Sequence, residues 1–374
     1  MDYLEAFFQQ MSVEPRRYQQ RIIRQAVEHY QKGLRSILIE SPTGSGKTVM
    51  GLLVAASMQQ QLGIKVGWVA MRRNLLAQAA ATVREHQIPL EAHWISMFEK
   101  DPPCNLDLLI VDEAQHDAAN SMAHLHSRIQ PKYILGLSAT PYRADKVKLC
   151  FDTVIRDAGI QQLMQDGYLS TYHHYTIPEY TPKSLAQLYS SDPARWGKSV
   201  AFFHQIEQCY SAQRLLQQAG INCDVVTGSS NREEQLDAFE AGKTDVLLNC
   251  MVLAEGFDCP TLQTVFCRPS GKGTTIQMAG RVFRKHPQVP LKQVVQCKKT
   301  RWPIVRTASA ELQYIWHEEG WRTLDVNPHI QQVGLQMMHA LAQTEITLPE
   351  YLNKKRSTRP QFWSESADMQ QESL

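Results

Sequence analysis

The feature that most constrains the fold is a short apolar run that leads through a glycine-bearing loop into an apolar helix. Residues 36–40 (SILIE) have the composition of a buried strand, residues 41–48 (SPTGSGKT) form the loop, and residues 50–61 (MGLLVAASMQQQ) continue as a helix. A strand, a glycine turn and a helix in direct succession are typical of a βα unit in a parallel sheet. The loop then lies at the start of a helix, where free backbone N–H groups and the helix dipole favour an anion.

Strands and helices continue to alternate along the chain in two blocks. In the first block we expect further strands at 65–71, 91–96, 106–111 and 132–137 and helices at 16–32, 74–86 and 118–128. In the second block we expect strands at 199–204, 223–227, 245–250 and 264–268 and helices at 205–219, 231–241 and 273–284. This rhythm predicts the α/β class, with two similar domains in tandem, each a mostly parallel sheet with helices on both faces.

The same pattern gives the expected domain boundaries. We expect a first domain over 1–147, a connector and second domain over 148–290, a small carboxy-terminal region over 291–353 and a disordered tail over 354–374. Residues 141–198 form the expected connector, with one helix at 159–166, one strand at 172–177 and a polar stretch that contains Pro178, Pro182 and Pro193.

Composition excludes several functional classes. The net charge is only +2, so bulk electrostatics do not indicate a nucleic-acid-binding protein, although a local basic surface is compatible with that value. No apolar stretch approaches the roughly 20 residues that span a bilayer, and the amino terminus has no basic leader, so we expect no membrane contact and a cytoplasmic location. The eight cysteines form no CxxC pair, which indicates reduced thiols rather than a metal site.

The glycine loop has the composition of a phosphate-binding loop. Gly44 and Gly46 permit backbone conformations that residues with a Cβ avoid, so N–H groups can turn toward phosphate oxygens. Lys47 is expected to reach the β- and γ-phosphates of ATP, and the hydroxyl of Thr48 to hold Mg²⁺. Ser41 stands where the strict pattern has its first glycine. The residues expected to contact the nucleotide here are Pro42, Thr43, Gly44, Ser45, Gly46, Lys47 and Thr48.

A second motif, LLIVDEAQ at residues 108–115, ends an apolar strand in two carboxylates. Asp112 is expected to hold Mg²⁺ through its water shell, and Glu113 to orient and deprotonate the attacking water. A third motif, SATP, ends the next strand. We expect the hydroxyls of Ser138 and Thr140 to link the acidic pair to the domain interface, although Ser, Thr and Pro are also common in ordinary turns.

A fourth motif, QMAGRVFR at residues 277–284, lies in the second block. Arg281 and Arg284 are three residues apart and are expected to project from one helix face. A planar, always charged guanidinium suits the charge that develops on a γ-phosphate. Given the phosphate loop in the first block, we predict that Arg281 and Arg284, together with Gln277, complete the catalytic site. The motif alone leaves a solvated basic helix face as the alternative.

In this order, the four motifs resemble those of superfamily 2 helicases of the DEAD/DEAH type over residues 14–286. The resemblance implies two RecA-like domains with ATP in the cleft between them and nucleic acid across the opposite rim. It also implies that Gln19, in the phrase RRYQ, reads the adenine edge. Gly256 and Asp258, in the phrase LAEGFD, are implied to contact ATP.

Two further phrases, LSATPYR and GYL, are similar to one branch of that superfamily. The branch holds the RadD-like DNA repair ATPases, the UvsW-type phage helicases and the motor subunits of type I and III restriction enzymes. Its acidic motif commonly has His at the fourth position, where Gln115 stands here. Gln115 can still hydrogen-bond across the cleft, and we expect it to join Ser138 and Thr140 in coupling hydrolysis to strand movement. The larger additional regions of that branch are not matched, so we expect a protein partner to supply targeting.

Nucleic-acid contacts are expected at two places. The phrase WVAMRRNLLAQ is similar to the motif that lies along the nucleic-acid backbone, which assigns Arg72 and Arg73 to it, and Thr227 and Gly228 are the candidates in the second block. Such contacts position a strand, weaken with salt and carry no sequence information. A solvated strand end is the alternative for the two arginines. The run KKTRW at 298–302 either stacks an unpaired base or forms a solvated turn beside a packed tryptophan.

These expectations converge on an ATP hydrolase of the helicase kind, with ATP and Mg²⁺ at its site. The preferred function is an ATP-dependent helicase or translocase that acts on DNA in replication, recombination or repair. Two alternatives stay open. One is an RNA-dependent ATPase with the same core, because backbone contacts do not separate the two sugars. The other is a subunit of a larger nucleic-acid-processing complex that binds ATP as a switch.

Overall fold

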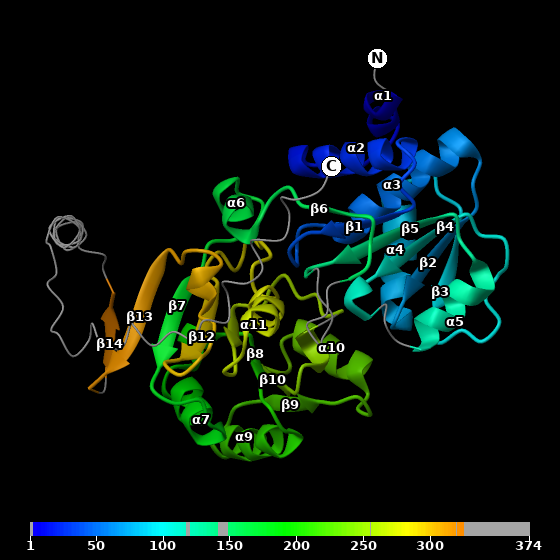
Figure 1. The fold of residues 1–374 in the computed structure, drawn as a ribbon. Coiled ribbons are helices and arrows are strands. Elements are labelled where there is room, and N and C mark those ends of the chain that lie inside the picture. Colours follow the sequence, from blue (N-terminus) through cyan, green and yellow to red (C-terminus); the bar gives the residue numbers. More distant parts are fainter. Residues whose placement is uncertain (1–2, 117–119, 141–148, 255, 319, 325–374) are drawn as a thin grey trace, which may run out of the picture. The chain divides into compact units, whose positions relative to one another are not determined.

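The computed structural model describes residues 3–116, 120–140, 149–254, 256–318 and 320–324. Within these ranges the chain forms two mostly parallel β-sheets with helices packed on them, one sheet from each block (Figure 1). The predicted α/β class and the two sheets are therefore confirmed. Glu255 and the predicted tail at 354–374 lie outside the described residues.

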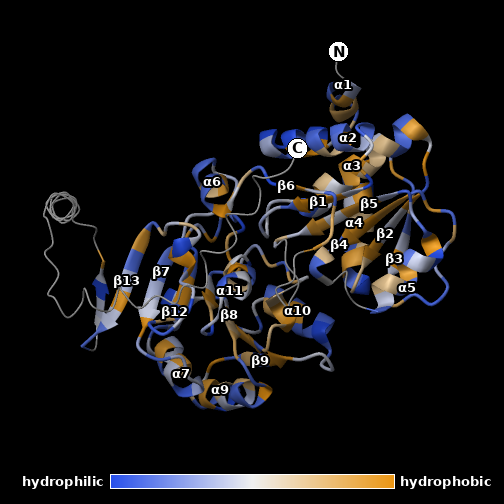
Figure 2. Ribbon diagram, in the orientation of Figure 1, coloured by the Kyte–Doolittle hydropathy of each residue, from blue (hydrophilic) through white to orange (hydrophobic). Residues whose placement is uncertain are grey.

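The first sheet contains six parallel strands in the order β3-β2-β4-β5-β1-β6. Its strands are β1 (Ser36–Glu40), β2 (Val66–Ala70), β3 (Ala92–Ser96), β4 (Leu108–Asp112), β5 (Tyr133–Ser138) and β6 (Thr153–Ile155). Every residue of β2 and β4 is buried, as expected for interior strands covered on both faces. Figure 2 shows these interior strands as predominantly hydrophobic.

Helix α3 lies at the centre of the first block. The helices of this block are α1 (Tyr3–Gln9), α2 (Arg17–Gln31), α3 (Lys47–Leu62), α4 (Arg73–Glu85), the short 3₁₀ helix η1 (Ala114–His116) and α5 (Asn120–Ile129). Nine consecutive residues of α3, from Met50 to Met58, are buried, so this helix is apolar on all sides. Helix α2 is amphipathic and packs its apolar side, which includes Ile23 and Val27, into the same core. The phosphate loop is therefore anchored by the best-buried helix of the block.

The expected connector is more ordered than its prolines suggested. Strand β6 joins the first sheet beside β1, and helix α6 (Ile160–Gln165) follows it. Helices α7 (Pro182–Ser191) and α8 (Pro193–Trp196) occupy the stretch expected to be polar loop. Both begin with proline at the first turn, a position that needs no N–H donor, so these prolines start helices. The prediction of a loose polar stretch there was wrong.

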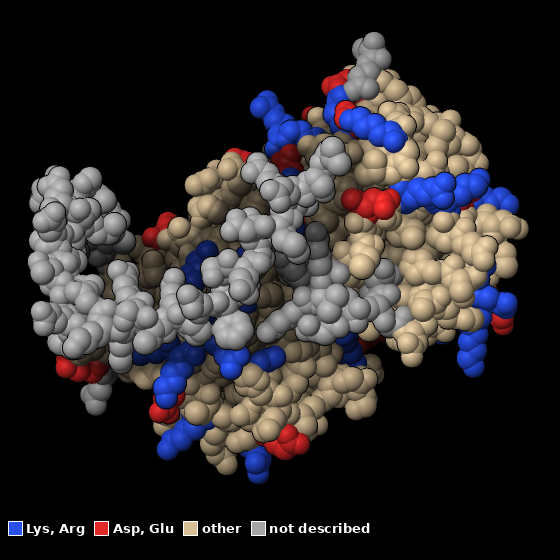
Figure 3. Space-filling model, in the orientation of Figure 1, with Lys and Arg blue, Asp and Glu red and all other residues tan. Residues whose placement is uncertain are grey.

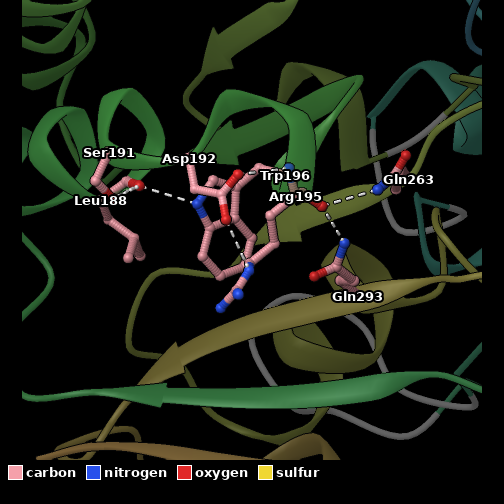
Figure 4. A network of polar contacts seen from close by, with 7 residues as sticks. All are labelled: Leu188, Ser191, Asp192, Arg195, Trp196, Gln263 and Gln293. Atoms are coloured by element: carbon pink, nitrogen blue, oxygen red, sulfur yellow. Dashed lines mark hydrogen bonds and ion pairs between the residues drawn. The ribbon is translucent and has the colours of Figure 1, made fainter. Parts of the chain in front are cut away.

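Helix α8 is fastened to the second sheet by a polar network (Figure 4). The carbonyl of Arg195 accepts hydrogen bonds from Nε2 of Gln263 at 2.8 Å and from Nε2 of Gln293 at 2.6 Å. The indole of Trp196 is fully buried and donates to the carbonyl of Leu188 at 2.9 Å. These bonds fix the start of the second block against its own sheet.

The second sheet contains eight strands in the order β14-β13-β7-β12-β11-β8-β10-β9. Its strands are β7 (His173–Ile177), β8 (Ser199–Phe202), β9 (Cys223–Val226), β10 (Val246–Asn249), β11 (Thr264–Phe266), β12 (Gln293–Cys297), β13 (Leu312–His317) and β14 (Gly320–Thr323). All neighbours are parallel except the pair β13 and β14. Strands β12 to β14 come from residues assigned in the sequence to a separate carboxy-terminal region, and β12 is a fully buried interior strand.

The helices of the second block are α9 (Ile206–Gln218), α10 (Arg232–Glu240), α11 (Lys272–Ala279) and the 3₁₀ helices η2 (Val252–Ala254) and η3 (Ile304–Arg306). Helix α11 is shorter than the predicted 273–284 and ends before both arginines of the fourth motif. Gly280, which follows it, is approached so closely that a Cβ would lie 3.0 Å from the Cβ of Thr43. Arg281 and Arg284 therefore do not share a helix face, and that prediction was wrong.

None of the helices in the described part of the chain combines the length and the apolar composition that crossing a membrane would require.

Candidate nucleotide site between the two blocks

The phosphate loop has the backbone conformation that its glycines permit. Gly44 and Gly46 both adopt left-handed φ angles, +82° and +80°, and α3 begins directly afterwards at Lys47. No side chain caps the start of α3, so its first N–H groups stay available to a ligand. The loop has the geometry of an anion site at a helix amino terminus.

Three side chains hold the loop through Ser45. The hydroxyl of Tyr18 and Nε2 of Gln19 both donate to the carbonyl of Ser45, the latter at 2.9 Å. The side-chain oxygens of Ser41 and Ser45 lie 2.7 Å apart, and both residues are buried. Ser41 therefore supplies a buried hydrogen-bond partner where a glycine was expected. A Cβ on Gly46 would lie 2.6 Å from Nε2 of Gln19, so glycine is required there for space as well as for φ.

Gln19 faces the loop. Its Oε1 accepts from the backbone N–H of Arg16 at 2.9 Å, and its Nε2 is engaged with Ser45. Gln19 is 5% exposed and lines neither of the two cavities described below. The reading of an adenine edge by Gln19 stays a prediction, and its contacts are those of a residue that positions the loop.

The acidic pair lies at the end of β4. Asp112 is buried, and its Oδ1 accepts from the backbone N–H of Glu113 at 3.0 Å. Burial, together with the neighbouring carboxylate of Glu113, raises the pKa of Asp112 to about 7. Burial also lowers the pKa of Lys47, while Glu113 and Asp112 act in the opposite direction. Glu113 itself has a φ of +54°, an uncommon conformation for a residue with a side chain.

A chain of polar contacts leads from Glu113 to the end of β5. Nε2 of Gln115 donates to Oε2 of Glu113 at 2.9 Å, and the hydroxyl of Ser138 lies 2.6 Å from Oε1 of Gln115. The backbone N–H of Thr140 donates to the hydroxyl of Ser138 at 3.1 Å. The structure therefore brings together the three residues predicted to couple hydrolysis to movement, and connects them to the predicted general base.

A cavity of about 350 Å³ lies between the loop and the second block. Its lining includes the loop, the acidic pair, one side of α4 and a segment of the second block. The lining residues are Thr43, Gly44, Gly46, Lys47, Thr48, Leu75, Gln78, Ala81, Thr82, Glu85, Asp112, Glu113, Gly256, Phe257, Asp258, Arg281 and Arg284. The contribution of α4 was missed in the sequence, because its exposed face resembles any solvated helix face.

The two arginines of the fourth motif have different contacts. Arg281 is 7% exposed, and its guanidinium donates to the carbonyl of Phe257 at 3.0 Å and to the carbonyl of Ala254. Arg284 forms an ion pair with Asp258, and its Cγ would lie 3.4 Å from a Cβ on Gly44. Burial lowers the pKa of Arg284 to about 10, so it stays charged at neutral pH. Arg284 reaches the phosphate loop, whereas Arg281 supports its own block.

A second cavity, of about 390 Å³, adjoins the first at Gly44, Gly46 and Arg284. Its other lining residues are Arg16, Gly167, Tyr168, Pro260 and Lys285. The ring of Tyr168 packs edge-on against Tyr18 at 5.1 Å, and Cζ of Arg16 lies 5.1 Å from the centre of the Tyr168 ring. Tyr168 belongs to the phrase GYL, and its place beside the phosphate loop was not predicted from the sequence.

The remaining predicted residues lie apart from this site. Gln277 is half-buried on α11 and does not line the first cavity. Nη1 of Arg72 donates to the carbonyl of Val252 at 3.2 Å, while Arg73 is exposed at the start of α4. Thr227 and Gly228 follow β9, where Oγ1 of Thr227 accepts from the backbone N–H of Ser230 at 3.0 Å. Pro42 and Ser45 belong to the loop but do not line the cavity.

The donors at the site fit a magnesium ion. At Asp112, burial and the Glu113 carboxylate outweigh the positive charge of Lys47, and Asp112 lies with the Thr48 hydroxyl in the lining of one cavity. Mg²⁺ takes oxygen ligands and is commonly bound by one or two carboxylates together with substrate phosphates. Across the described ranges, no cluster of three His, Cys, Asp or Glu residues forms a complete metal site.

Two family models match the chain. The model of the helicase conserved C-terminal domain matches residues 181–286, and the model of the type III restriction enzyme, res subunit, matches residues 12–97. The first match covers the segment that carries Arg281 and Arg284, and the second covers the phosphate loop.

Relatives with similar sequences are found in yeast and in a phage. IRC3 of Saccharomyces cerevisiae, a protein assigned to the ATP-dependent helicases, is 24% identical over 340 residues, which cover 72% of this chain and 49% of the relative. A 51.5 kDa protein of a Lactococcus phage is 25% identical over 273 residues, covering 62% of this chain and 59% of the relative. The chain thus spans 49% and 59% of the lengths of these two relatives.

Solved structures with similar folds have low sequence identity. The type ISP restriction-modification enzyme LlaBIII, bound to DNA, superposes with a TM-score of 0.58 at 15% identity, over 78% of this chain and 28% of that one. Dbp5 of S. cerevisiae, bound to RNA and ADP BeF3, superposes with a TM-score of 0.56 at 16% identity, over 79% of this chain and 87% of that one. The superpositions confirm the predicted fold of two tandem RecA-like domains.

Proposed function

Because the chain belongs to the superfamily 2 helicases, a class of ATP-hydrolysing enzymes, we propose that it uses ATP hydrolysis to move along or separate strands of nucleic acid. One observation carries the proposal. A single cavity is lined by a phosphate loop and an acidic pair from one RecA-like domain and by Arg284 from the other. A nucleotide bound there contacts both domains, so its hydrolysis can change how they are held together.

The contacts at the site suggest a role for each residue. We assign the phosphates to the N–H groups of the loop and to Lys47, and Mg²⁺ to Thr48 and Asp112. Glu113 orients and deprotonates the attacking water, and Gln115 holds the Glu113 carboxylate in place through its 2.9 Å hydrogen bond. When bound, Mg²⁺ neutralises charge on the phosphates.

Arg284 and Arg281 receive separate roles in this proposal. Arg284 stabilises the developing charge on the γ-phosphate, because it is the arginine that reaches Gly44 of the loop. Its ion pair with Asp258 holds the guanidinium in place. Arg281 positions the loop at 254–257 through its two carbonyl contacts. The nucleoside of ATP occupies the adjoining cavity beside Tyr168 and Arg16.

DNA is the favoured substrate within this proposal. The restriction-enzyme family model and the DNA-bound restriction enzyme with a similar fold support it, whereas Dbp5 bound to RNA supports the alternative. Backbone contacts from Arg73, Thr227 and Gly228 give little sequence specificity. We also propose that a protein partner supplies targeting.

The test is the release of phosphate from ATP with and without nucleic acid. The proposal predicts a low rate for the protein alone and a saturable increase with a single-stranded DNA oligonucleotide. A matched RNA oligonucleotide separates the two substrates, because stimulation by RNA alone would replace DNA with RNA in the proposal. Equal rates with and without either polymer would contradict the motor function.

The variant Glu113→Gln separates binding from turnover. The amide cannot accept the proton of the attacking water, so turnover should be abolished while binding of a fluorescent ATP analogue is retained. Glu91→Gln is the matched control, because Glu91 is an exposed carboxylate of the same block that does not line the cavity. Turnover by the Glu113→Gln protein at the wild-type rate would remove Glu113 from the catalytic role.

A further inference from the structure

The carboxyl edge of the second sheet concentrates positive charge. Five neighbouring parallel strands, β12, β11, β8, β10 and β9, end at this edge. The segments that follow them are 298–302, 267–272, 203–205, 250–254 and 227–231. The segments after β11 and β12, 267–272 and 298–302, contain five Lys or Arg residues and no Asp or Glu, in a chain whose net charge is only +2. Figure 3 shows several Lys and Arg side chains on the lower part of the molecule, which carries the second block.

Backbone hydrogen bonds join the two most basic of these segments. The N–H of Trp302 donates to the carbonyl of Ser270 at 3.1 Å, and the N–H of Ser270 donates to the hydroxyl of Thr300 at 3.3 Å. The N–H of Lys298 donates to the carbonyl of Ile177 on the neighbouring strand at 3.0 Å. The loops after β11 and β12 therefore form one fixed surface, and their cations are held close together.

The ring of Trp302 contacts two cations of this surface, Lys272 and Arg306. Its Nε1 donates to the hydroxyl of Thr307 at 3.0 Å, which fixes the ring. Nζ of Lys272 lies 5.4 Å from the centre of the ring, and Cζ of Arg306 lies 5.5 Å from it. Cation–π contacts at such distances hold a positive charge without neutralising it. Trp302 of the KKTRW run therefore positions Lys272 and Arg306 through its ring. Because both cations occupy the ring, stacking of an unpaired base on it is the less suitable role.

The cations of this surface lack carboxylate partners. Among the described residues, no Asp or Glu forms an ion pair with Lys272, Lys298, Lys299, Arg301 or Arg306. Some cations elsewhere have a carboxylate partner, as Lys132 has in Asp107 at 2.8 Å. Unpaired positive charges held in a fixed arrangement attract an extended polyanion.

Two neutral groups on the same surface also lack partners. The hydroxyl of Ser270 is buried and makes no hydrogen bond within the described ranges. Helix α11 begins two residues later, and its amino terminus, after Gly271, carries no side-chain cap. A free hydroxyl and free N–H groups beside Lys272 supply donors of the kind that phosphate oxygens accept.

We propose that Lys272, Trp302 and Arg306, with the cations of the 298–301 loop, form a binding surface for the phosphodiester backbone of a nucleic-acid strand. This inference rests on the proposed function and adds to it a contact surface outside the four motifs. None of these residues lines the ATP cavity. The surface extends toward Thr227 along the sheet edge, because β12 and β9 are four inter-strand spacings apart, about 19 Å at roughly 4.8 Å per spacing.

The test measures affinity against salt concentration. The double variant Lys272→Gln/Arg306→Gln removes two charges from the surface. Each phosphate contact on a single strand contributes about 0.7 to the slope of log affinity against log salt, so the slope should become shallower by about 1.4. At about 0.1 M salt this corresponds to roughly 25-fold weaker binding. The readout is the fluorescence anisotropy of labelled oligo-dT and oligo-rU of about 20 nucleotides, a length that covers more than one typical single-strand binding site.

The matched control is Lys183→Gln/Lys243→Gln, which removes two exposed lysines of the second block away from this edge. Lys183 lies in α7 and Lys243 precedes β10. The proposal predicts an unchanged slope for the control, and equal changes in both double variants would overturn it. The variant Trp302→Leu keeps both cations but removes the aromatic ring that positions them. We therefore expect a smaller loss of oligonucleotide affinity than for the double variant. Wild-type affinity of Trp302→Leu would remove Trp302 from the proposal.

Failure of this inference is distinguishable from failure of the proposed function. If wild-type protein binds an oligonucleotide and its ATP turnover rises with it, the proposed function stands. A Lys272→Gln/Arg306→Gln protein with the wild-type salt slope would then overturn the surface alone. Absence of oligonucleotide binding by the wild-type protein would overturn both.

Discussion

The two sheets present opposite chemistry at the same geometric position. At the carboxyl edge of the first sheet, β4 ends in Asp112 and Glu113, and β1 leads into a loop whose phosphate donors are mainly backbone N–H groups. At the carboxyl edge of the second sheet, the segments 267–272 and 298–302 after β11 and β12 carry five cations, four of them exposed, and no carboxylate. Both edges suit phosphate, but they do so with different groups.

The difference in chemistry between the two sheet edges follows from the ligand proposed for each edge. Hydrolysis requires one phosphate group in one geometry, which fixed backbone donors, a buried lysine and a carboxylate pair can provide. A nucleic-acid backbone must be held without being locked to one register, and exposed cations on a surface provide attraction with little directional demand. Arg284 is the exception that connects the blocks, because it comes from the second and reaches the loop of the first.

The largest effect that would sharpen this comparison is expected for Arg284→Ala. If the second block supplies the cation for the γ-phosphate, the variant should lower kcat on the order of 10³-fold with nucleic acid present, because an arginine finger contributes that much or more. Folding should be retained, since Arg284 is partly exposed and Asp258 is its ion-pair partner among the described residues. Phosphate release at saturating ATP is the measurement, and a kcat within a few-fold of wild type would contradict the role.

The next effect concerns Arg281, whose guanidinium donates to two carbonyls of the second block. Arg281→Ala leaves the carbonyls of Ala254 and Phe257 without their donor in a buried environment. Hydrogen bonds to charged groups contribute about 1.5–3 kcal/mol each, so the loss of two should lower the free energy of unfolding by about 3–6 kcal/mol. Urea denaturation measures it. If Arg281→Ala keeps the wild-type stability and loses as much turnover as Arg284→Ala, the separate roles proposed for the two arginines would be contradicted.

The smallest effect isolates the backbone geometry of the first edge. Gly46→Ala places a Cβ 2.6 Å from Nε2 of Gln19 at a φ of +80°, whereas Gly63→Ala at a φ of +63° meets nothing within 4 Å. The left-handed conformation costs each variant roughly 1–2 kcal/mol of stability. Gly46→Ala should lose about 1–3 kcal/mol more, because Gln19 must move.

Unfolding by urea gives the difference between the two glycine variants. Affinity for a fluorescent ATP analogue should fall only for Gly46→Ala, since Gly63 ends α3 far along the chain from the loop. Equal losses of stability in both variants would mean that the contact with Gln19 is unimportant.

The parts of the site that could be predicted from the sequence are those fixed by local chemistry. Gly44, Gly46 and Lys47 reveal the loop because glycine and lysine at that spacing have few other uses after a buried strand. Asp112 and Glu113 were predictable because two carboxylates at the end of an apolar run are costly to bury without a function.

The parts that could not be predicted depend on contacts between distant residues. Helix α11 ends at Ala279 because Gly280 packs against Thr43 and Arg281 turns back to the carbonyls of residues 254 and 257. Neither contact can be predicted from the sequence around Gly280 and Arg281, because the partner residues are distant in the chain. Pro182 and Pro193 were assigned to a loop because proline is common in loops. In the structure both lie in the first turn of a helix, where proline is tolerated.

The most direct test of the central claim is one titration of phosphate release against single-stranded oligonucleotide, carried out on three proteins. The account predicts that wild type is stimulated, that Glu113→Gln shows no turnover at any concentration, and that Lys272→Gln/Arg306→Gln reaches the wild-type maximum only at higher oligonucleotide concentration. The carboxyl edge of the first sheet would then carry ATP hydrolysis, and that of the second sheet would bind the nucleic acid. A lowered maximum with an unchanged half-saturating concentration for Lys272→Gln/Arg306→Gln would contradict the account.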